Sequence, residues 1–286
     1  MLRRAFPAMG THVELLLDAP DQPLAAAALR AAEDEFHRLE SLLSRFRPDS
    51  ELARLNRDGE IVAGPDLLAV AQLAVEARAR SEGRFDPTIH DALCAAGYHS
   101  TFAEIALAGG PEEPAAGSCN GSVTIDPTRS SITLGHGVHI DLGGIAKGFA
   151  VDRASELLST VGPSLVNAGG DIAATGEWIV GVETEGEPLA LALIDGALAT
   201  SGRDRRRWLR DGEERHHLID PSTGRPAESD LLRVTAFAAT AVEAEVIAKT
   251  RFLAGFDRAV EEADDVGAPC VLVAQDGRCA LAGGLA

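Results

Sequence analysis

Cysteine is scarce in this sequence, and the few cysteines that occur form no pattern. The 286 residues contain Cys94, Cys119, Cys270 and Cys279, with no CxxC pair among them. Metal and redox sites built on cysteine need short, regular spacings, which these positions lack. The sequence therefore predicts thiols of the core or the surface, and it leaves disulfides open.

Long hydrophobic runs are absent as well. Leu15-Leu-Leu17 is too short for the apolar segment of a secretion signal, and Pro7 and Gly10 precede it. No stretch approaches the roughly 20 apolar residues that a membrane-spanning helix needs. We therefore expect a cytoplasmic protein that does not insert into a membrane.

Basic residues are a minority among the charged side chains. The chain has 26 Lys and Arg against 44 Asp and Glu, a formal net charge of −18 at pH 7. An acidic surface repels phosphate backbones, so nucleic acid and anionic membranes are not expected partners. An anionic ligand would need a locally basic or metal-assisted site. With 45% hydrophobic residues, the chain can bury a sizeable core, and we predict a single domain over residues 1–286.

The sequence also lacks internal repeats, a GxGxxG fingerprint and a Walker A motif. Apolar periodicity predicts helices at Gln22–Phe46, Pro65–Glu82, Gly143–Val161 and Ala241–Ala254. It predicts strands at Thr11–Leu17, Ser122–Ile125, Ser131–Leu134, Ser164–Asn167, Trp178–Val182, Ala190–Ile194, His216–Ile219, Leu232–Ala238 and Cys270–Ala274. This mixed order favours an α+β fold over a doubly wound sheet, with a loop over Gly109–Gly117.

The most informative segment is Asp141-Leu-Gly-Gly-Ile-Ala-Lys147-Gly148. It is predicted to leave a short strand at Val138–Asp141, turn on two glycines and enter a helix. Free backbone N–H groups and a positive dipole end at such a helix start suit an anion. Lys147 opposes the dipole there, which points to an anionic partner nearby. Asn167-Ala-Gly-Gly-Asp171 is predicted to form a tight turn between strands, and together the two segments indicate a nucleotide site.

An ordered set of further motifs extends along almost the whole chain. The motifs are Met9-Gly-Thr11, Ser44-Arg-Phe46 with the run to Asn56, Gly83-Arg-Phe85-Asp86-Pro-Thr88, Thr200-Ser-Gly202, His217-Leu-Ile-Asp220-Pro-Ser-Thr-Gly224-Arg-Pro226 and Thr240-Ala-Val-Glu-Ala-Glu245-Val-Ile-Ala-Lys249. In this order and spacing they resemble the ApbE family of FAD:protein FMN transferases. The resemblance implies an α/β mixed, ApbE-like fold of two interleaved lobes, with a flavin-binding cleft between them.

The resemblance also implies a set of FAD contacts. The positions concerned are Met9, Phe46, Arg84, Phe85, Asp86, Asp141, Lys147 and Leu218. Met9 and Phe46 offer apolar surface to flat rings, although ordinary core packing is the alternative for both. Asp141 could accept hydrogen bonds from a purine or isoalloxazine edge, and Lys147 could meet a pyrophosphate.

His217 is the candidate catalytic residue. FMN attachment requires a serine or threonine hydroxyl to attack the FMN-side phosphorus, and a neutral imidazole can take up the hydroxyl proton near pH 7. The resemblance gives this role to the histidine of the His-Leu-Ile-Asp-Pro motif. In an extended segment His216 and His217 point to opposite faces, so we choose His217. The alternative is a histidine pair that merely alternates across a strand.

The metal site departs from the family pattern. Relatives typically bind magnesium with an aspartate, a threonine four residues later and a backbone carbonyl near the position of Gly144. The corresponding side chains here are Glu245 and Lys249. Glutamate remains a hard oxygen ligand, but a lysine ammonium only donates hydrogen bonds and repels a cation. Glu245 and Lys249 could form an ordinary i,i+4 pair on an exposed face, or Lys249 could act as a built-in cation.

The sequence thus predicts a transferase that moves FMN from FAD to a Ser/Thr hydroxyl of an acceptor flavoprotein and releases AMP. Magnesium is expected to be held by Gly144 and Glu245, and Lys249 is expected to weaken its binding. Two alternatives stay open: hydrolysis of FAD to FMN and AMP, and a non-catalytic protein that binds FAD or another nucleotide.

Overall fold

The computed structural model describes residues 1–105, 118–204, 206–210 and 213–285. The predicted loop at Gly109–Gly117 lies outside the described residues. The chain divides into two compact units that interleave in sequence. Unit 1 comprises residues 1–40, 145–202 and 229–286, and unit 2 comprises residues 41–144 and 203–228. Both combine helices with antiparallel strands, so the predicted α+β class is confirmed.

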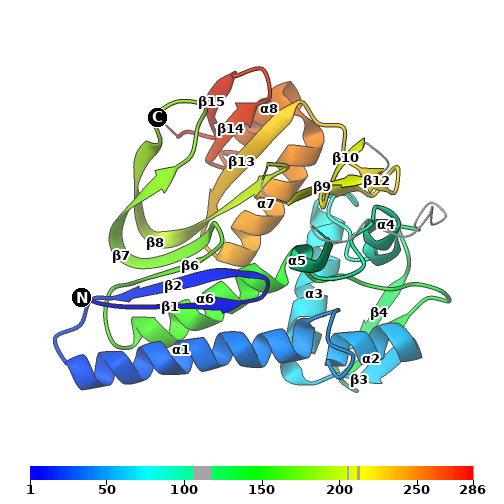
Figure 1. The fold of residues 1–286 in the computed structure, drawn as a ribbon, viewed down its shortest axis with the longest axis horizontal. Coiled ribbons are helices and arrows are strands. Elements are labelled where there is room, and N and C mark those ends of the chain that lie inside the picture. Colours follow the sequence, from blue (N-terminus) through cyan, green and yellow to red (C-terminus); the bar gives the residue numbers. More distant parts are fainter. Residues whose placement is uncertain (106–117, 205, 211–212, 286) are drawn as a thin grey trace. The chain divides into compact units, whose positions relative to one another are not determined.

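Unit 1 is built on an eight-stranded antiparallel sheet with the order β1-β2-β6-β7-β8-β13-β14-β15 (Figure 1). Its strands are β1 Leu2–Ala8, β2 Thr11–Leu17, β6 Ser164–Ala168, β7 Asp171–Val182, β8 Leu189–Gly202, β13 Leu231–Ala238, β14 Cys270–Ala274 and β15 Cys279–Ala282. Val13, Leu15 and Leu17 are fully buried on one face of β2, as period-two alternation requires. All five residues of β14 are buried, so this strand is covered on both faces.

Four helices accompany this sheet: α1 Gln22–Leu43, α6 Ala146–Ser159, α7 Ala241–Ala254 and α8 Phe256–Val266. Helix α6 packs on β6 and β7, and α7 packs on β8 and β13. The two helices also contact each other. An added Cβ on Gly148 of α6 would lie 2.8 Å from the backbone of Ala241 in α7, so only glycine permits this approach.

Two tight turns in unit 1 rely on left-handed backbone. Residues Met9 and Gly10 join β1 to β2 with φ of 52° and 68°. Gly169 and Gly170 join β6 to β7 with φ of 66° and 104°. Two consecutive positive φ values are typical of the type I′ turns that match strand twist. The predicted turn in Asn167–Asp171 is therefore confirmed.

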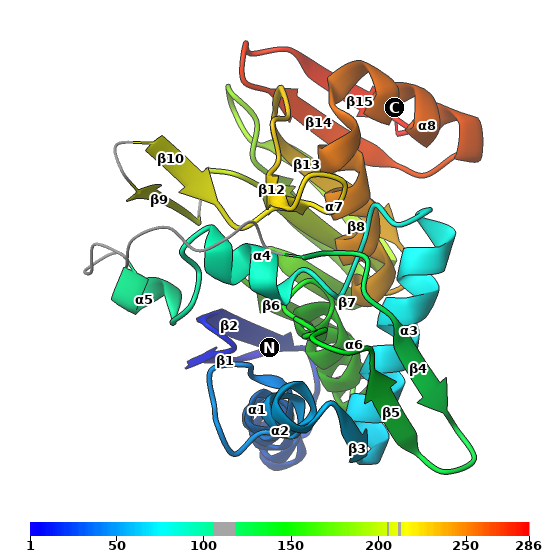
Figure 2. The same ribbon diagram turned by 90° about the vertical axis from the view of Figure 1, so that its right-hand side faces the viewer.

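Unit 2 combines helices with short strands (Figure 2). Its helices are α2 Glu51–Asp58, α3 Pro65–Arg80, α4 His90–Ala95 and α5 Phe102–Ile105. Its strands are β3 Glu60–Val62, β4 Val123–Asp126, β5 Ser131–Leu134, β9 Arg207–Arg210, β10 Glu213–His216, β11 Ile219–Asp220 and β12 Arg225–Pro226. The first three form a sheet with the order β3-β5-β4.

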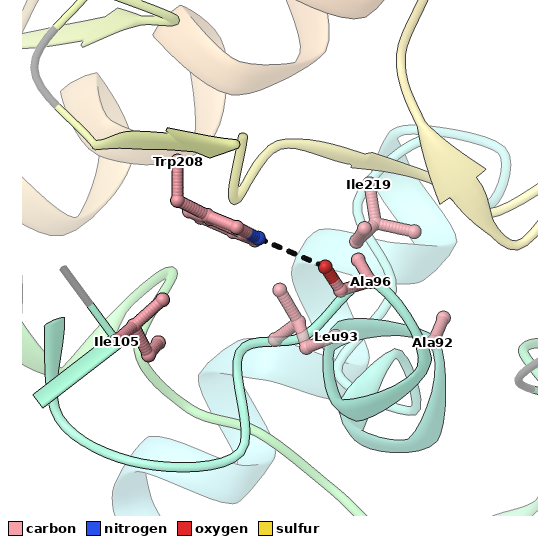
Figure 3. Packing of buried hydrophobic residues seen from close by; sticks show 6 residues of the cluster. All are labelled: Ala92, Leu93, Ala96, Ile105, Trp208 and Ile219. Atoms are coloured by element: carbon pink, nitrogen blue, oxygen red, sulfur yellow. Dashed lines mark hydrogen bonds between the residues drawn. The ribbon is translucent and has the colours of Figure 1, made fainter. Parts of the chain in front are cut away.

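A small apolar cluster joins the two sequence-distant parts of unit 2. Trp208 and Ile219, from the second segment, pack with Leu93, Ala96 and neighbours on and after α4. Figure 3 shows the Trp208 Nε1–H donating to the carbonyl of Ala96, at 3.0 Å. This bond satisfies the indole's polar group inside the cluster, so burial of the tryptophan leaves no donor of its side chain unpaired.

Several predicted elements need correction. Residues 138–141 form no strand, and α6 begins at Ala146 rather than at Gly143. His216–Ile219 is not one strand, because β10 ends at His216 and a bend at His217 precedes β11. Strands β7 and β8 are longer than predicted. The elements that were not predicted are β1, α2, β3, α4, α5, β9, β12, α8 and β15. Among the described residues, none of the helices is long and apolar enough to cross a membrane.

Candidate functional site

The residues predicted to bind FAD are divided between the two units. Of the predicted FAD contacts, Met9 and Lys147 belong to unit 1, and the positions at 46, 84–86, 141 and 218 belong to unit 2. The predicted metal ligand Glu245 belongs to unit 1, whereas the predicted catalytic His217 and the predicted metal ligand Gly144 belong to unit 2. Each unit brings its own share into a defined arrangement.

In unit 1, four charged side chains form a buried network. Lys147, in the first turn of α6, pairs with Asp171 at the start of β7 and with Glu245 of α7. Its Nζ lies 2.8 Å from Oε1 of Glu245. Lys249 donates to the same oxygen from one helical turn away, at 3.0 Å. Pairing with the two ammonium groups compensates the burial of the Asp171 and Glu245 carboxylates, while Lys147 and Lys249 stay 15% and 18% exposed.

The backbone of α6 completes the surroundings of Glu245. The amide of Gly148 donates to Oε2 of Glu245 at 3.1 Å. Burial would raise the pKa of Glu245, but the ammonium groups of Lys147 and Lys249 hold it down at about 2. Burial and the neighbouring Glu245 carboxylate raise the pKa of Asp171. Glu245 is therefore the firmly ionised member of the network.

Two interpretations of Glu245 and Lys249 were open: an i,i+4 pair on an exposed helix face, and a lysine that acts as a built-in cation. The i,i+4 pair does form, as the simpler interpretation requires. Glu245 is nevertheless 1% exposed, so the pair is not on an exposed helix face. Thr250 faces another direction, because its hydroxyl donates back to the carbonyls of Val246 and Ile247. Lys249 thus places a positive charge on the carboxylate that a metal would need.

Magnesium fits this donor set poorly. One oxygen of Glu245 already accepts from two ammonium groups and the other from an amide. Magnesium requires near-octahedral oxygen ligands at about 2.0–2.1 Å, and lysine supplies none. A dication beside Glu245 would also face the repulsion of Lys147 and Lys249.

In unit 2, Asp141 is fixed by two partners. Its Oδ2 lies 2.8 Å from Nε of Arg45, and its Oδ1 accepts from the amide of Gly143 at 2.8 Å. Both side chains of the ion pair are more than nine-tenths buried. That Asp141 accepts hydrogen bonds from a flavin or purine edge stays a prediction, and its carboxylate also forms an internal ion pair with Arg45.

Arg45 also explains the setting of Phe46. Its guanidinium carbon lies 4.3 Å from the ring centre of Phe46 and 4.7 Å from that of Tyr98. Both contacts are within cation–π range. Arg45 was assigned no role from the sequence. The available signal was its place in Ser44-Arg-Phe46, one residue before a predicted ligand contact.

Asp86 is committed to the turn that follows Phe85. Its carboxylate accepts from the amide and hydroxyl of Thr88 and from the amide of Asn120, at 2.7–2.9 Å. Phe85 and Asp86 are buried, whereas Arg84 is half-buried. These contacts hold the loop before α4 in place, and the predicted FAD contacts of the three residues stay untested.

The two histidines after β9 differ in environment. Burial lowers the pKa of His216, whose Nε2 lies 3.1 Å from the carbonyl of Ala227 while its Nδ1 accepts from the amide of Leu218. His217 occupies the bend and is half-buried, and Leu218 is buried. The alternation of faces expected for an extended segment does not apply here, because the chain bends at His217. His216 is instead set apart by its two backbone contacts.

Met9 lies in the β1–β2 turn of unit 1. Its side chain is half-buried, and its amide donates to Oε1 of Glu40 at 2.8 Å. Asp171, also in unit 1, was assigned no role of its own from the sequence. Its place directly after the glycine pair, in the segment Asn167–Asp171, was the available signal.

The chain is similar to known flavin transferases over most of its length. A FAD:protein FMN transferase of Treponema pallidum is 30% identical over 279 residues, spanning 82% of this chain and 74% of the relative. One from Escherichia coli K12 is 25% identical, over 94% of this chain and 83% of the relative.

Solved structures are similar along nearly the whole chain. The ApbE protein of Thermotoga maritima matches with a TM-score of 0.85 and 26% identity, over 98% of this chain and 96% of that one. The flavin transferase ApbE of Vibrio cholerae matches in fold, with a TM-score of 0.78 and 21% identity over 98% and 96% of the two chains. The ApbE family model matches residues 9–272, and the chain belongs to the ApbE family.

Proposed function

We propose that this protein transfers FMN from FAD to a serine or threonine hydroxyl of an acceptor flavoprotein and releases AMP. The observation that carries the proposal is the match to FAD:protein FMN transferases over most of the chain. Lys147 and Lys249 are 15% and 18% exposed, and their ammonium groups are the cations that unit 1 offers to an anionic dinucleotide in a chain of net charge −18.

The reaction exchanges one phosphorus–oxygen bond for another. The acceptor oxygen bonds to the FMN-side phosphorus, the pyrophosphate bond from that phosphorus breaks, and AMP departs with the bridging oxygen. We assign the hydroxyl proton to His217, a half-buried histidine at a bend. Lys147 is assigned to the pyrophosphate, because its ammonium lies at the N-terminal turn of α6 and is 15% exposed.

The remaining predicted contacts are proposed for the rings and the ribose. Met9 and Phe46 offer half-buried apolar surface, and Asp141 offers a fixed carboxylate. Arg84, Phe85, Asp86 and Leu218 are assigned to the walls of the site on the same ground of resemblance. A metal held by Gly144 and Glu245 is not part of the proposed mechanism, because the donors at Glu245 fit magnesium poorly.

The experiment that tests the proposal measures the transfer of FMN to an acceptor protein by the change in the acceptor's mass. The full chain is incubated with FAD and a candidate acceptor, with magnesium or with EDTA, and the acceptor is weighed. The addition of one FMN is expected, with AMP in equal amount. His217→Ala should keep FAD binding and lose transfer by about a hundredfold or more.

His136→Ala is the matched control, because His136 is an exposed histidine outside the proposed site. Equal losses in the two histidine variants would contradict the role of His217. A wild-type chain that binds FAD without any release of AMP would contradict the transferase.

A second candidate function is binding of FAD without catalysis. The observation in its favour is the 3.0 Å hydrogen bond from Lys249 to Glu245, because the resemblance implies a metal ligand at the position of Lys249. The acceptor assay separates the candidates: AMP with FMN on the acceptor indicates transfer, AMP with free FMN indicates hydrolysis, and bound FAD without AMP indicates a binder.

A further inference from the structure

A second group of metal-binding side chains lies in unit 2, and none of its members is assigned to flavin transfer. His90 and Asp91 begin helix α4, and His139 comes from the segment before Asp141. Oδ1 of Asp91 lies 3.0 Å from Nδ1 of His90 and 2.9 Å from Nδ1 of His139. One ligand atom from each residue lies within 4.8 Å of the others.

The spacing is close to that of a metal centre. Ligand atoms bonded at about 2.0–2.1 Å in a tetrahedral zinc site lie about 3.4 Å apart. The two nitrogen–oxygen distances need to open by about half an ångström to admit an ion. The side chains are 22%, 33% and 39% exposed for His90, Asp91 and His139, so an ion and a water molecule can reach them.

The donor types select the class of ion. Two imidazoles and one carboxylate suit zinc and other divalent transition metals, whereas magnesium and calcium prefer sites made of oxygen. The guanidinium of Arg45 is the cation near His90, and it is paired with the carboxylate of Asp141.

Cys94 lies beside this group without completing it. Its Sγ is 4.0 Å from both ring nitrogens of His90, but it does not share the 4.8 Å limit with all three residues. Arg45 donates to the same sulfur at 3.7 Å. The fourth coordination position is thus left to solvent, as in zinc sites with three protein ligands.

We propose that His90, Asp91 and His139 form a binding site for one divalent transition-metal ion of the zinc class, with water as the fourth ligand. The ion would tie the start of α4 to the segment that leads to Asp141. The alternative is a hydrogen-bonded triad, in which both imidazoles donate to Asp91 and no ion binds.

The experiment titrates Zn²⁺ into the full chain by calorimetry, with excess Mg²⁺ present to occupy sites made of hard oxygen ligands. One Zn²⁺ per chain is expected, with a rise in Tm. Asp91→Asn and His139→Gln should each weaken the affinity by about a hundredfold or more, since they remove a direct ligand. Asparagine and glutamine can still hydrogen-bond, so both variants keep a way to hold the local fold.

His136→Gln is the matched control, since this exposed histidine lies three residues before His139 and outside the group. It should bind Zn²⁺ as the wild type does. Zn²⁺ affinity that is unchanged in Asp91→Asn and His139→Gln, or a wild type that binds no Zn²⁺, would overturn the proposal. Circular dichroism of each variant shows that a loss of binding is not a loss of folding. No readout depends on flavin transfer.

Discussion

Lys249 occupies a position at which the resemblance to the ApbE family implies a metal ligand. Its ammonium donates to a carboxylate that is 1% exposed, together with Lys147. A single positive charge on each lysine can balance phosphate charge without the fixed octahedral geometry of magnesium. The site is therefore expected to bind FAD in the presence of EDTA.

The double variant Glu245→Asp with Lys249→Thr restores the aspartate and the threonine that the resemblance implies for a metal site. It should raise magnesium affinity and make turnover depend on magnesium, because a hard oxygen replaces an ammonium. Calorimetry with Mg²⁺ and the mass assay measure the two effects. Glu243→Asp on the same helix is the control and should change neither. Strict magnesium dependence in the wild type, unaltered in the double variant, would contradict the role of Lys249.

The network of Lys147, Asp171, Glu245 and Lys249 depends on the contact between helices α6 and α7. Gly148 allows the two helices to meet, and its amide donates to Glu245. Gly148→Ala should lower the free energy of unfolding by about 1–3 kcal/mol, since the new methyl group meets the backbone of Ala241. It should also weaken FAD binding, because α7 carries Glu245 and Lys249.

Gly181→Ala is the control for that variant, because a Cβ added at Gly181 meets nothing within 4 Å. Urea unfolding measures both variants. Equal free energies of unfolding in the two variants would show that α7 can shift to admit the methyl group without loss of stability.

A second prediction at the scale of elements concerns Asp152. From α6 it accepts the first two amides of α7, those of Ala241 and Val242, at 2.7 and 3.0 Å. Burial raises its pKa to about 6, against the pull of these amides. The folded chain therefore holds a proton on Asp152 that the unfolded chain releases near pH 4.

Stability should consequently fall as the pH rises from about 4 to about 6, by up to about 3 kcal/mol from this group. Asp152→Asn should remove that part of the pH dependence. Urea unfolding at several pH values, for both chains, gives the difference curve. A difference that is flat between pH 4 and 6 would contradict the raised pKa.

At the scale of the whole molecule, the interleaving of the chain decides what can fold alone. Residues 41–144 lack Trp208 and Ile219, which complete the cluster around α4, and lack the carbonyl of Pro221 that accepts from Asn120. A fragment of residues 41–144 should therefore remain without fixed tertiary structure, since its core is incomplete.

A single polypeptide in which a flexible linker joins residues 203–228 to that fragment should recover dispersed NMR signals and a cooperative thermal transition. A cooperative transition in the fragment without residues 203–228 would show that Trp208 and Ile219 are dispensable.

Local pattern was enough for much of the fold. Alternation of apolar residues identified β2, and apolar periodicity with the Thr240 cap identified the full extent of α7. The glycine pair between β6 and β7 was predictable because only glycine adopts two left-handed conformations in a row without strain. The ordered motifs identified the family, since their spacing is a property of the sequence itself.

The tertiary structure alone decided which charges meet. Lys147, Asp171 and Glu245 come from three separate elements, and no spacing in the sequence predicts that they share one buried network. Arg45 and Asp141 are separated by 95 intervening residues, yet they form an ion pair that is nearly free of solvent. Long-range ion pairs depend on how strands and helices pack, whereas helix and strand periodicity depends on neighbours in the chain. The sequence therefore determined the family and most elements, and packing determined the electrostatics of the site.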